Sequence, residues 1–158
     1  MRYKFATAML HQLQNNKDVY FITADLGFKI FDEIIHSFPD RAMTIGASEQ
    51  LMLGMAVGLA SSGKIPFVYS ITPFLLYRPF ELIRNYVDHE QINIKLIGSG
   101  RDNDYAHDGF THYAGDDRTI LSSFKNIECH WPAKEDDMHK IINDIAKSNK
   151  PCYLNLSR

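Results

Sequence analysis

Cysteine is scarce in this chain of 158 residues, which contains only Cys129 and Cys152 and no CxxC pair. A redox or metal pair built from two adjacent cysteines is therefore excluded. Each cysteine lies in an apolar run typical of a strand, so both are expected to be buried thiols. Free thiols are typical of a reducing compartment, and a cytoplasmic location is expected.

Runs of one charge and long apolar runs are also missing. The seventeen basic residues are dispersed and the formal net charge is −2, which excludes the electrostatic pattern of a protein that binds nucleic acid or a membrane surface. No apolar stretch approaches the ~20 residues that span a bilayer. The first residues, MRYKFATAMLHQLQ, carry charges and lack a small-residue cleavage site, so a signal peptide is not expected.

What the sequence does contain is a regular alternation of apolar segments. Its apolar content of 45% and charged content of 23% are ordinary for a globular protein, and its length suits a single domain over 1–158. Strands are expected at 19–23, 42–46, 65–70, 92–99, 127–131 and 152–157, and helices around 5–13, 30–38, 48–61, 75–89, 117–123 and 135–147. This alternation predicts an α/β fold with a doubly wound, mainly parallel six-stranded sheet and helices on both faces.

Residues that could carry chemistry follow the carboxyl ends of these strands, where ligands bind in doubly wound folds. Glu49 stands in the first turn of an apolar helix, where a carboxyl group either faces a site or simply complements the helix dipole. Burial among Leu51, Met52 and Met55 would favour its un-ionised form. Phe74, at the end of a strand, is either a stacking ring or a core residue.

Several ordered motifs resemble one known family. The stretch that starts at Phe38 reads FPDRAMTIGASEQLMLGMAVGLA and is similar to the segment FPDRF…GIAEQNMVGIAAGLA of transketolases. The likeness continues through IPFVYSITPFLLYRPFELIRNYV, HDGFTHYAGDDRTIL and the closing LNLSR, and so covers about 24–158. The chain thus resembles the pyrimidine-binding (Pyr) domain of the transketolase family, in the form of the carboxyl-terminal section of a split enzyme.

The resemblance implies thiamine diphosphate as the cofactor. In the family the glutamate of the AEQ motif, here Glu49, hydrogen-bonds the ring nitrogen N1′ of the aminopyrimidine and favours the imino tautomer that acts as an internal base. Phe74 matches the aromatic residue that stacks on the pyrimidine. Asp25, in TADLG, matches an aspartate near the cofactor, although it could equally cap a helix.

The polar loop RDNDYAHDGFTHYAGDD resembles the family motif GxxGEDGPTHQ. Asp108 and His112 match an aspartate and a histidine that contact substrate hydroxyls and assist proton transfers, and Arg158 matches an arginine used for substrate phosphate. Phe110 replaces the proline of the motif, and Gly100 stands where the family has a histidine for sugar phosphates, so the usual sugar-phosphate substrates are in doubt. Without cysteine or HExxH spacing, no metal site is expected on this chain.

The sequence contains no GDG segment followed by an asparagine, the motif that binds Mg²⁺ and diphosphate in the family. The resemblance therefore implies a companion subunit that carries the diphosphate-binding (PP) domain and holds the Mg²⁺, in a heterotetramer of two pairs. Gly54 and Gly58 lie four residues apart on one helix face and would let another helix approach closely. We expect this face, together with Glu49, to meet the companion.

Three functions are consistent with these residues. The first is a transketolase-like transferase that moves a two-carbon ketol or acyl unit between carbonyl compounds, including sugar-derived ones. The second is a subunit of a split thiamine-diphosphate-dependent 2-oxo acid decarboxylase, and the third is a non-catalytic scaffold. The combination of FPDR, AEQ and DGxTH favours the first, and the joint presence of Glu49, Phe74 and His112 weighs against the scaffold.

Overall fold

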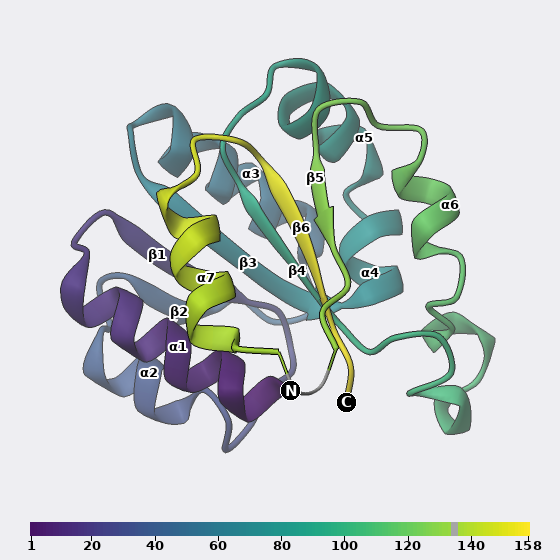
Figure 1. Ribbon diagram of the computed structural model, residues 1–158, viewed down its shortest axis with the longest axis horizontal. Helices are drawn as coiled ribbons and strands as arrows, with labels where there is room; N and C mark the ends of the chain where they lie inside the picture. Colours follow the sequence, from purple (N-terminus) through teal and green to yellow (C-terminus); the bar gives the residue numbers. More distant parts are fainter. Residues whose placement is uncertain (134–135) are drawn as a thin grey trace.

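The computed structural model describes residues 1–133 and 136–158, and its centre is one six-stranded sheet (Figure 1). The strands have the order β2-β1-β3-β4-β6-β5, and every neighbouring pair is parallel. They are β1 (Val19–Thr23), β2 (Ala42–Thr44), β3 (Ile65–Ile71), β4 (Lys95–Ser99), β5 (Glu128–His130) and β6 (Cys152–Leu156). The predicted doubly wound α/β fold is confirmed.

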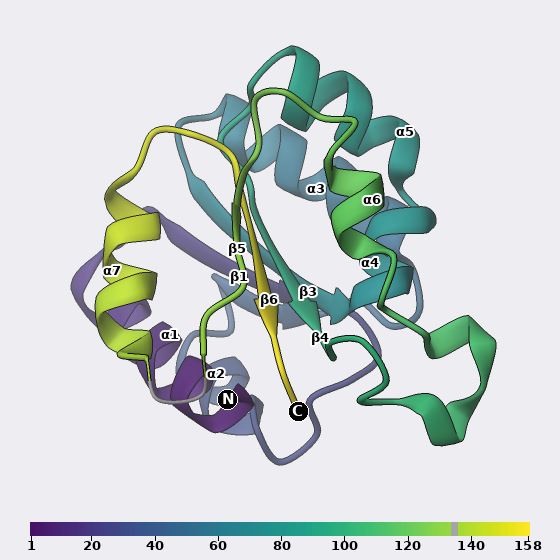
Figure 2. The same ribbon diagram turned by 45° about the vertical axis from the view of Figure 1, so that its right-hand side comes forward.

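Helices cover both faces of the sheet, as Figures 1 and 2 show. One layer consists of α1 (Arg2–Asn15), α2 (Asp32–Ser37) and α7 (Met138–Lys147), and the other of α3 (Glu49–Ser61), α4 (Thr72–Tyr77), α5 (Phe80–Leu82) and α6 (Asp117–Leu121). Side chains alternate along each strand, so Phe21 and Tyr69 pack with the first layer while Ile22 and Val68 pack with the second. Burial on both faces explains why the strands are apolar throughout rather than alternating.

The predicted helix at 75–89 is wrong in its extent and in its continuity. It begins at Thr72 and divides into α4, α5 and a π-helical segment η1 (Ile83–His89). Pro79 lies between α4 and α5, and a proline inside a helix removes an N–H donor and clashes with the preceding turn. The interruption therefore follows from the sequence, and it places Arg78 at the end of α4.

The predicted helix at 135–147 begins later than expected, at Met138, and residue 135 of the predicted range lies outside the described residues. Asp137 is its N-cap, and the carboxylate accepts a hydrogen bond from the N–H of Lys140 at 3.1 Å. The apolar stripe expected along this helix is present, since Ile142 and Ile145 are buried against the sheet. The remaining predicted elements start or end within a few residues of those in the structure.

The segment predicted as a long polar loop at 100–116 contains regular structure. Two short 3-10 turns, η2 (Ala106–Asp108) and η3 (Phe110–His112), lie within it, and an antiparallel bridge between Asp102 and Ala114 closes its base. The bridge holds the turns in a compact projection beside α4 and α6 (Figure 2). Local hydrogen bonds of this kind leave little trace in hydrophobic periodicity, so the pattern of the sequence did not indicate them.

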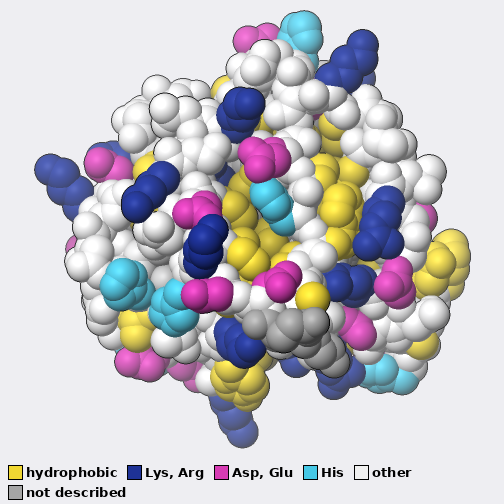
Figure 3. Space-filling view, in the orientation of Figure 1, with side chains coloured by type: hydrophobic (Ala, Val, Ile, Leu, Met, Phe, Trp, Pro, Cys, Tyr) yellow, Lys and Arg dark blue, Asp and Glu magenta, His cyan; other side chains and the backbone are white. Residues whose placement is uncertain are grey.

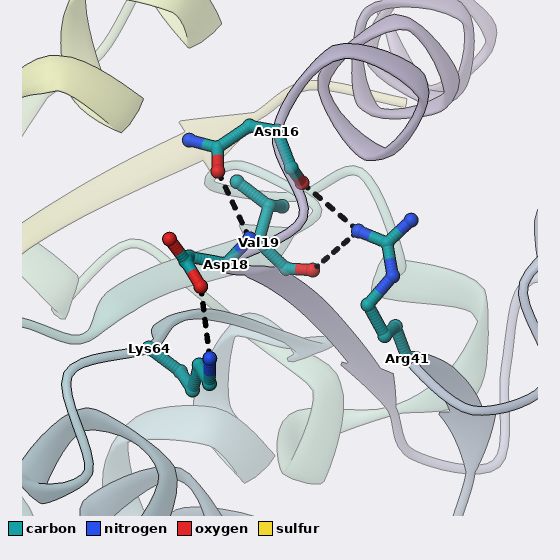
Figure 4. Close-up of polar contacts among 5 residues, drawn as sticks. All are labelled: Asn16, Asp18, Val19, Arg41 and Lys64. Atoms are coloured by element: carbon teal, nitrogen blue, oxygen red, sulfur yellow. Dashed lines mark hydrogen bonds and ion pairs between the residues drawn. The ribbon is translucent and has the colours of Figure 1, made fainter.

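Polar contacts hold the amino ends of β1, β2 and β3 together (Figure 4), at the end of the sheet opposite the one where α3 and α4 begin. The guanidinium of Arg41 donates to the carbonyl oxygens of Asn16 at 2.9 Å and Val19 at 3.2 Å. The ammonium of Lys64 donates to the carboxylate of Asp18 at 2.8 Å. These contacts join the starts of β1, β2 and β3 and therefore act on stability rather than on the candidate site.

Another part of the surface shows apolar side chains among charged ones. Figure 3 shows them on the face that carries α7, with acidic, basic and histidine side chains around them. A groove on the α7 side is lined by Glu128, His130, Ile141, Asp144, Ile145, Ser148 and Cys152. The sheet separates this groove from the layer that contains α3 and α4. None of the helices in the described part of the chain combines the length and apolarity needed to cross a bilayer.

The two cysteines differ in burial. Cys152 is buried as expected, whereas Cys129 is only partly buried. Burial raises the pKa of the Cys152 thiol to about 12 and the pKa of the Cys129 thiol to about 11. Both thiols are therefore poor nucleophiles near neutral pH.

Candidate functional site

One buried carboxylate lies at the carboxyl ends of the strands, on the side of the sheet covered by α3 and α4. Glu49 is the first residue of α3 and only 2% exposed. The hydroxyl of Ser70, near the end of β3, donates to its Oε1 at 2.8 Å. The guanidinium of Arg78 donates to its Oε2 at 2.6 Å. Both carboxylate oxygens therefore have a side-chain partner, as a buried charge requires.

The surroundings expected for Glu49 are partly wrong. Met52 is buried below it, but Leu51 is 57% exposed and Met55 only partly buried. The carboxyl group is held by a hydroxyl and a guanidinium rather than by apolar side chains alone. Its two oxygens also do not serve as a simple helix cap, because both bind side chains of other elements.

Phe74 is linked to this carboxylate by Arg78, which contacts both side chains. The Cζ atom of Arg78 stands 3.8 Å from the centre of the Phe74 ring, a close cation–π contact. The ring of His112 meets Phe74 edge-on, with 4.9 Å between ring centres. Three side chains singled out from the sequence, Glu49, Phe74 and His112, are thus brought together in one continuous set of contacts.

Ser70 and Arg78 were not indicated by the sequence motifs. A usable signal existed for Arg78, because a residue four positions after Phe74 lies on the same helix face. Its contact with Glu49 joins residues 29 apart in the sequence, and only the three-dimensional structure brings the start of α3 and the end of α4 together.

The other two substrate candidates form a second cluster. The guanidinium of Arg158 lies 3.4 Å from Nε2 of His107, whose Nε2 is 3.3 Å from the Asp108 carboxylate. Arg158 also lies over the ring of Tyr105, at 5.3 Å from its centre. That ring is 6.4 Å from the ring of His112, so this exposed cluster borders the group around Glu49.

Asp25 stands apart from both groups. It is exposed beyond the end of β1, and among the described residues its carboxylate has neither a hydrogen bond nor an ion pair. It does not cap the next helix either, since α2 begins at Asp32 with Phe31 as its N-cap. The helix-cap interpretation is therefore wrong, and a ligand-binding role for Asp25 stays a prediction.

Two hollows meet at Arg78. One is lined by Pro73, Phe74, Tyr77, Arg78, Phe110, Thr111, Tyr113 and Asp116, and the other by Ala47, Ser48, Glu49, Gln50, Leu51 and Arg78. A buried carboxyl group next to an aromatic ring suits a flat heteroaromatic group that stacks and forms a hydrogen bond through a ring nitrogen, so these residues fit an aminopyrimidine. Among the described residues, no three His, Cys, Asp or Glu side chains converge as a metal site.

Comparisons with known proteins point to one family. The family model for the transketolase pyrimidine-binding domain matches residues 1–158. One of the subunits of the apulose-4-phosphate transketolase of Actinobacillus succinogenes is 32% identical over 122 residues, which are 77% of this chain and 39% of that protein. The 6-deoxy-6-sulfo-D-fructose transketolase subunit of a Clostridium species is 27% identical over 162 residues, which are 100% of this chain and 49% of that protein.

A solved structure gives the same result for the fold. The structure described as a split gene transketolase, inactive beta4 tetramer, superposes with a TM-score of 0.86 at 27% identity and covers 99% of this chain and 50% of that one. The chain thus spans about half or less of the length of these relatives. The match of the family model to the whole sequence places the chain in the family of transketolase pyrimidine-binding domains.

Proposed function

We propose that this chain is a single pyrimidine-binding domain, over residues 1–158, of a thiamine-diphosphate-dependent transketolase-type enzyme. The enzyme transfers a two-carbon ketol or acyl unit between carbonyl substrates, including sugar-derived ones. The names of the apulose-4-phosphate and sulfofructose transketolase subunits support this reaction class. The observation that carries the proposal is the buried Glu49 carboxylate, which is fixed beside Phe74 at the strand ends.

Each residue of the site has a role that follows from its position. Thiamine diphosphate, when bound, supplies the carbanion chemistry that protein side chains lack. Glu49 holds a hydrogen bond at the pyrimidine nitrogen, and Ser70 fixes the carboxylate so that it points in one direction. Phe74 offers a flat apolar surface to the ring. His112, half-buried against Phe74, is placed to move a proton at a substrate oxygen.

Asp108 and Arg158 are proposed to bind the substrate beyond the ring. Both are exposed on the side of His112, and Arg158 keeps a permanent positive charge that suits an anionic or hydroxylated group. Asp25 is proposed to contact the cofactor, because its exposed carboxylate follows β1 at the same edge of the sheet.

A companion subunit is proposed to hold the diphosphate and the Mg²⁺. The surface of α3 supports this, since an added side-chain carbon at Gly54 or Gly58 would meet nothing within 4 Å and Leu51 is largely exposed. Because the residues on this face of α3 are small and exposed, a helix of the partner could pack closely against it in a heterotetramer of two pairs.

The test is the variant Glu49→Gln in the enzyme reconstituted from this chain and its companion subunit. We expect transfer activity to fall by about 10³-fold, because an amide holds no transferable proton at the pyrimidine nitrogen. The control is Glu81→Gln, which changes an exposed glutamate on α5 and should leave the rate unchanged. Unaltered activity of the Glu49→Gln enzyme would show the chain to be a scaffold. Release of carbon dioxide without transfer to an aldehyde would indicate a decarboxylase.

A further inference from the structure

One side chain makes both contacts that the proposed cofactor ring requires. The guanidinium of Arg78 donates to the Glu49 carboxylate at 2.6 Å and lies over the Phe74 ring at 3.8 Å. An aminopyrimidine bound as proposed would stack on the same aromatic ring and would bind Glu49 at Oε2, the oxygen that Arg78 holds, because Oε1 already accepts a hydrogen bond from Ser70. Two flat groups cannot occupy one place, so the arginine and the ring exclude each other.

The chemistry of the two groups explains why one can stand in for the other. A guanidinium is planar, donates hydrogen bonds in its plane and stacks on aromatic faces. A protonated or hydrogen-bonding aminopyrimidine shares all three properties. Arg78 also neutralises a carboxylate that is 2% exposed and that would otherwise be a partly compensated buried charge.

We propose that Arg78 is a resident plug of the pyrimidine site, which occupies the place of the aminopyrimidine in the free chain and leaves when the ring enters. This inference rests on the proposed function of the Glu49 site. The arginine thereby sets the affinity of the chain for the cofactor and keeps Glu49 paired until the cofactor arrives.

The position of Arg78 permits such a movement. Its side chain is 42% exposed, in contrast to its buried partner, so it can turn into solvent without disturbing the core. It is the common wall of the two hollows described above, and its departure would join them into one. It also lies at the end of α4, directly before Pro79, where the helix is already interrupted. Ser70 continues to hold the other oxygen of Glu49 after the arginine has left.

The test uses the full chain and thiamine, which contains the aminopyrimidine but no diphosphate, in an NMR titration at millimolar concentrations. The variant Arg78→Met keeps the length of the side chain and removes the guanidinium. If the plug fills the site nine times in ten, its removal raises the apparent affinity for thiamine about tenfold. The matched control is Arg84→Met, since Arg84 is exposed and its guanidinium bonds only to the side chain of Asn85 among the described residues. The affinity of the Arg84→Met variant for thiamine should equal that of the native chain.

A second variant protects the test against misfolding. Arg78→Lys retains the charge but cannot stack as a flat plate on Phe74, so it should also bind thiamine more tightly than the native chain. Equal or weaker binding by both Arg78 variants would overturn the plug, as would the absence of any binding to the native chain and to both variants. The function proposed for Glu49 is tested separately, because the loss of activity in the Glu49→Gln enzyme does not depend on Arg78. If that loss occurs while the Arg78 variants bind no better, only the plug is wrong.

Discussion

At the scale of single residues, the centre of the site is a buried carboxylate whose two oxygens already have hydrogen-bond donors within the fold. Glu49 sits at the start of α3 with one oxygen bound to Ser70 and the other to Arg78. Burying a carboxylate is costly unless its oxygens find hydrogen-bond donors, so Ser70 and Arg78 contribute to the stability of the fold as well as to ligand binding. A change at either partner should therefore be visible in stability as well as in ligand binding.

The variant Ser70→Ala tests this directly. Ser70 is fully buried, and its loss leaves Oε1 of Glu49 without a donor inside the protein. We expect the free energy of unfolding to fall by about 1–2 kcal/mol, as measured by urea denaturation. Ser62→Ala is the matched control, because the Ser62 hydroxyl is exposed and, within the described part of the chain, bonds only to the Gly58 carbonyl in the last turn of α3. A loss no larger than that of the control would mean that water replaces the serine at no cost.

At the scale of elements, hydrophobic periodicity predicts the order of strands and helices, whereas the interruption after α4 is indicated by Pro79 and not by periodicity. The strands were recognisable because burial on two faces makes each of them an uninterrupted apolar run. The motifs indicated Glu49 and Phe74, whose types match a known pattern. The motifs do not indicate Arg78, because its contact with Glu49 joins the end of α4 to the start of α3 across 29 residues of sequence, which periodicity does not show.

The amino-terminal edge of the sheet offers an element-scale prediction. Arg41 joins the segment before β1 to β2 through hydrogen bonds to the carbonyls of Asn16 and Val19 (Figure 4). Arg41→Ala should lower the free energy of unfolding by about 2 kcal/mol, because partly buried carbonyl groups lose a charged donor. Lys64→Ala removes a single, half-exposed ion pair to Asp18 and should cost less. Equal losses in the two variants, measured by urea denaturation, would contradict this account. Thiamine binding should be unchanged in both, since the edge lies opposite the site.

At the scale of the whole molecule, the two helical layers bury groups that titrate only at high pH. The sheet core contains the Cys152 thiol and the phenols of Tyr69 and Tyr153, and burial raises the pKa of each of them. All three are neutral when protonated, so the folded state holds their protons more tightly than the unfolded chain does. Stability at alkaline pH is therefore a collective property of the core and not of one element.

The pH dependence of unfolding follows from the sign of these shifts. The Cys152 pKa rises from 9.0 to about 12 on folding, so its contribution is fully present below pH 9 and is lost as the pH approaches 12, because only the unfolded chain releases the proton. The free energy of unfolding should thus decrease with pH in this window, by at most about 1.4 kcal/mol per pH unit for this thiol. Cys152→Ala should make the decrease less steep. The contributions of the two tyrosines remain in this variant, as does that of Lys95, whose lowered pKa acts in the opposite direction. Urea denaturation of both chains at a series of pH values measures the two slopes. Identical slopes would mean that the thiol is not shielded from solvent in the folded protein.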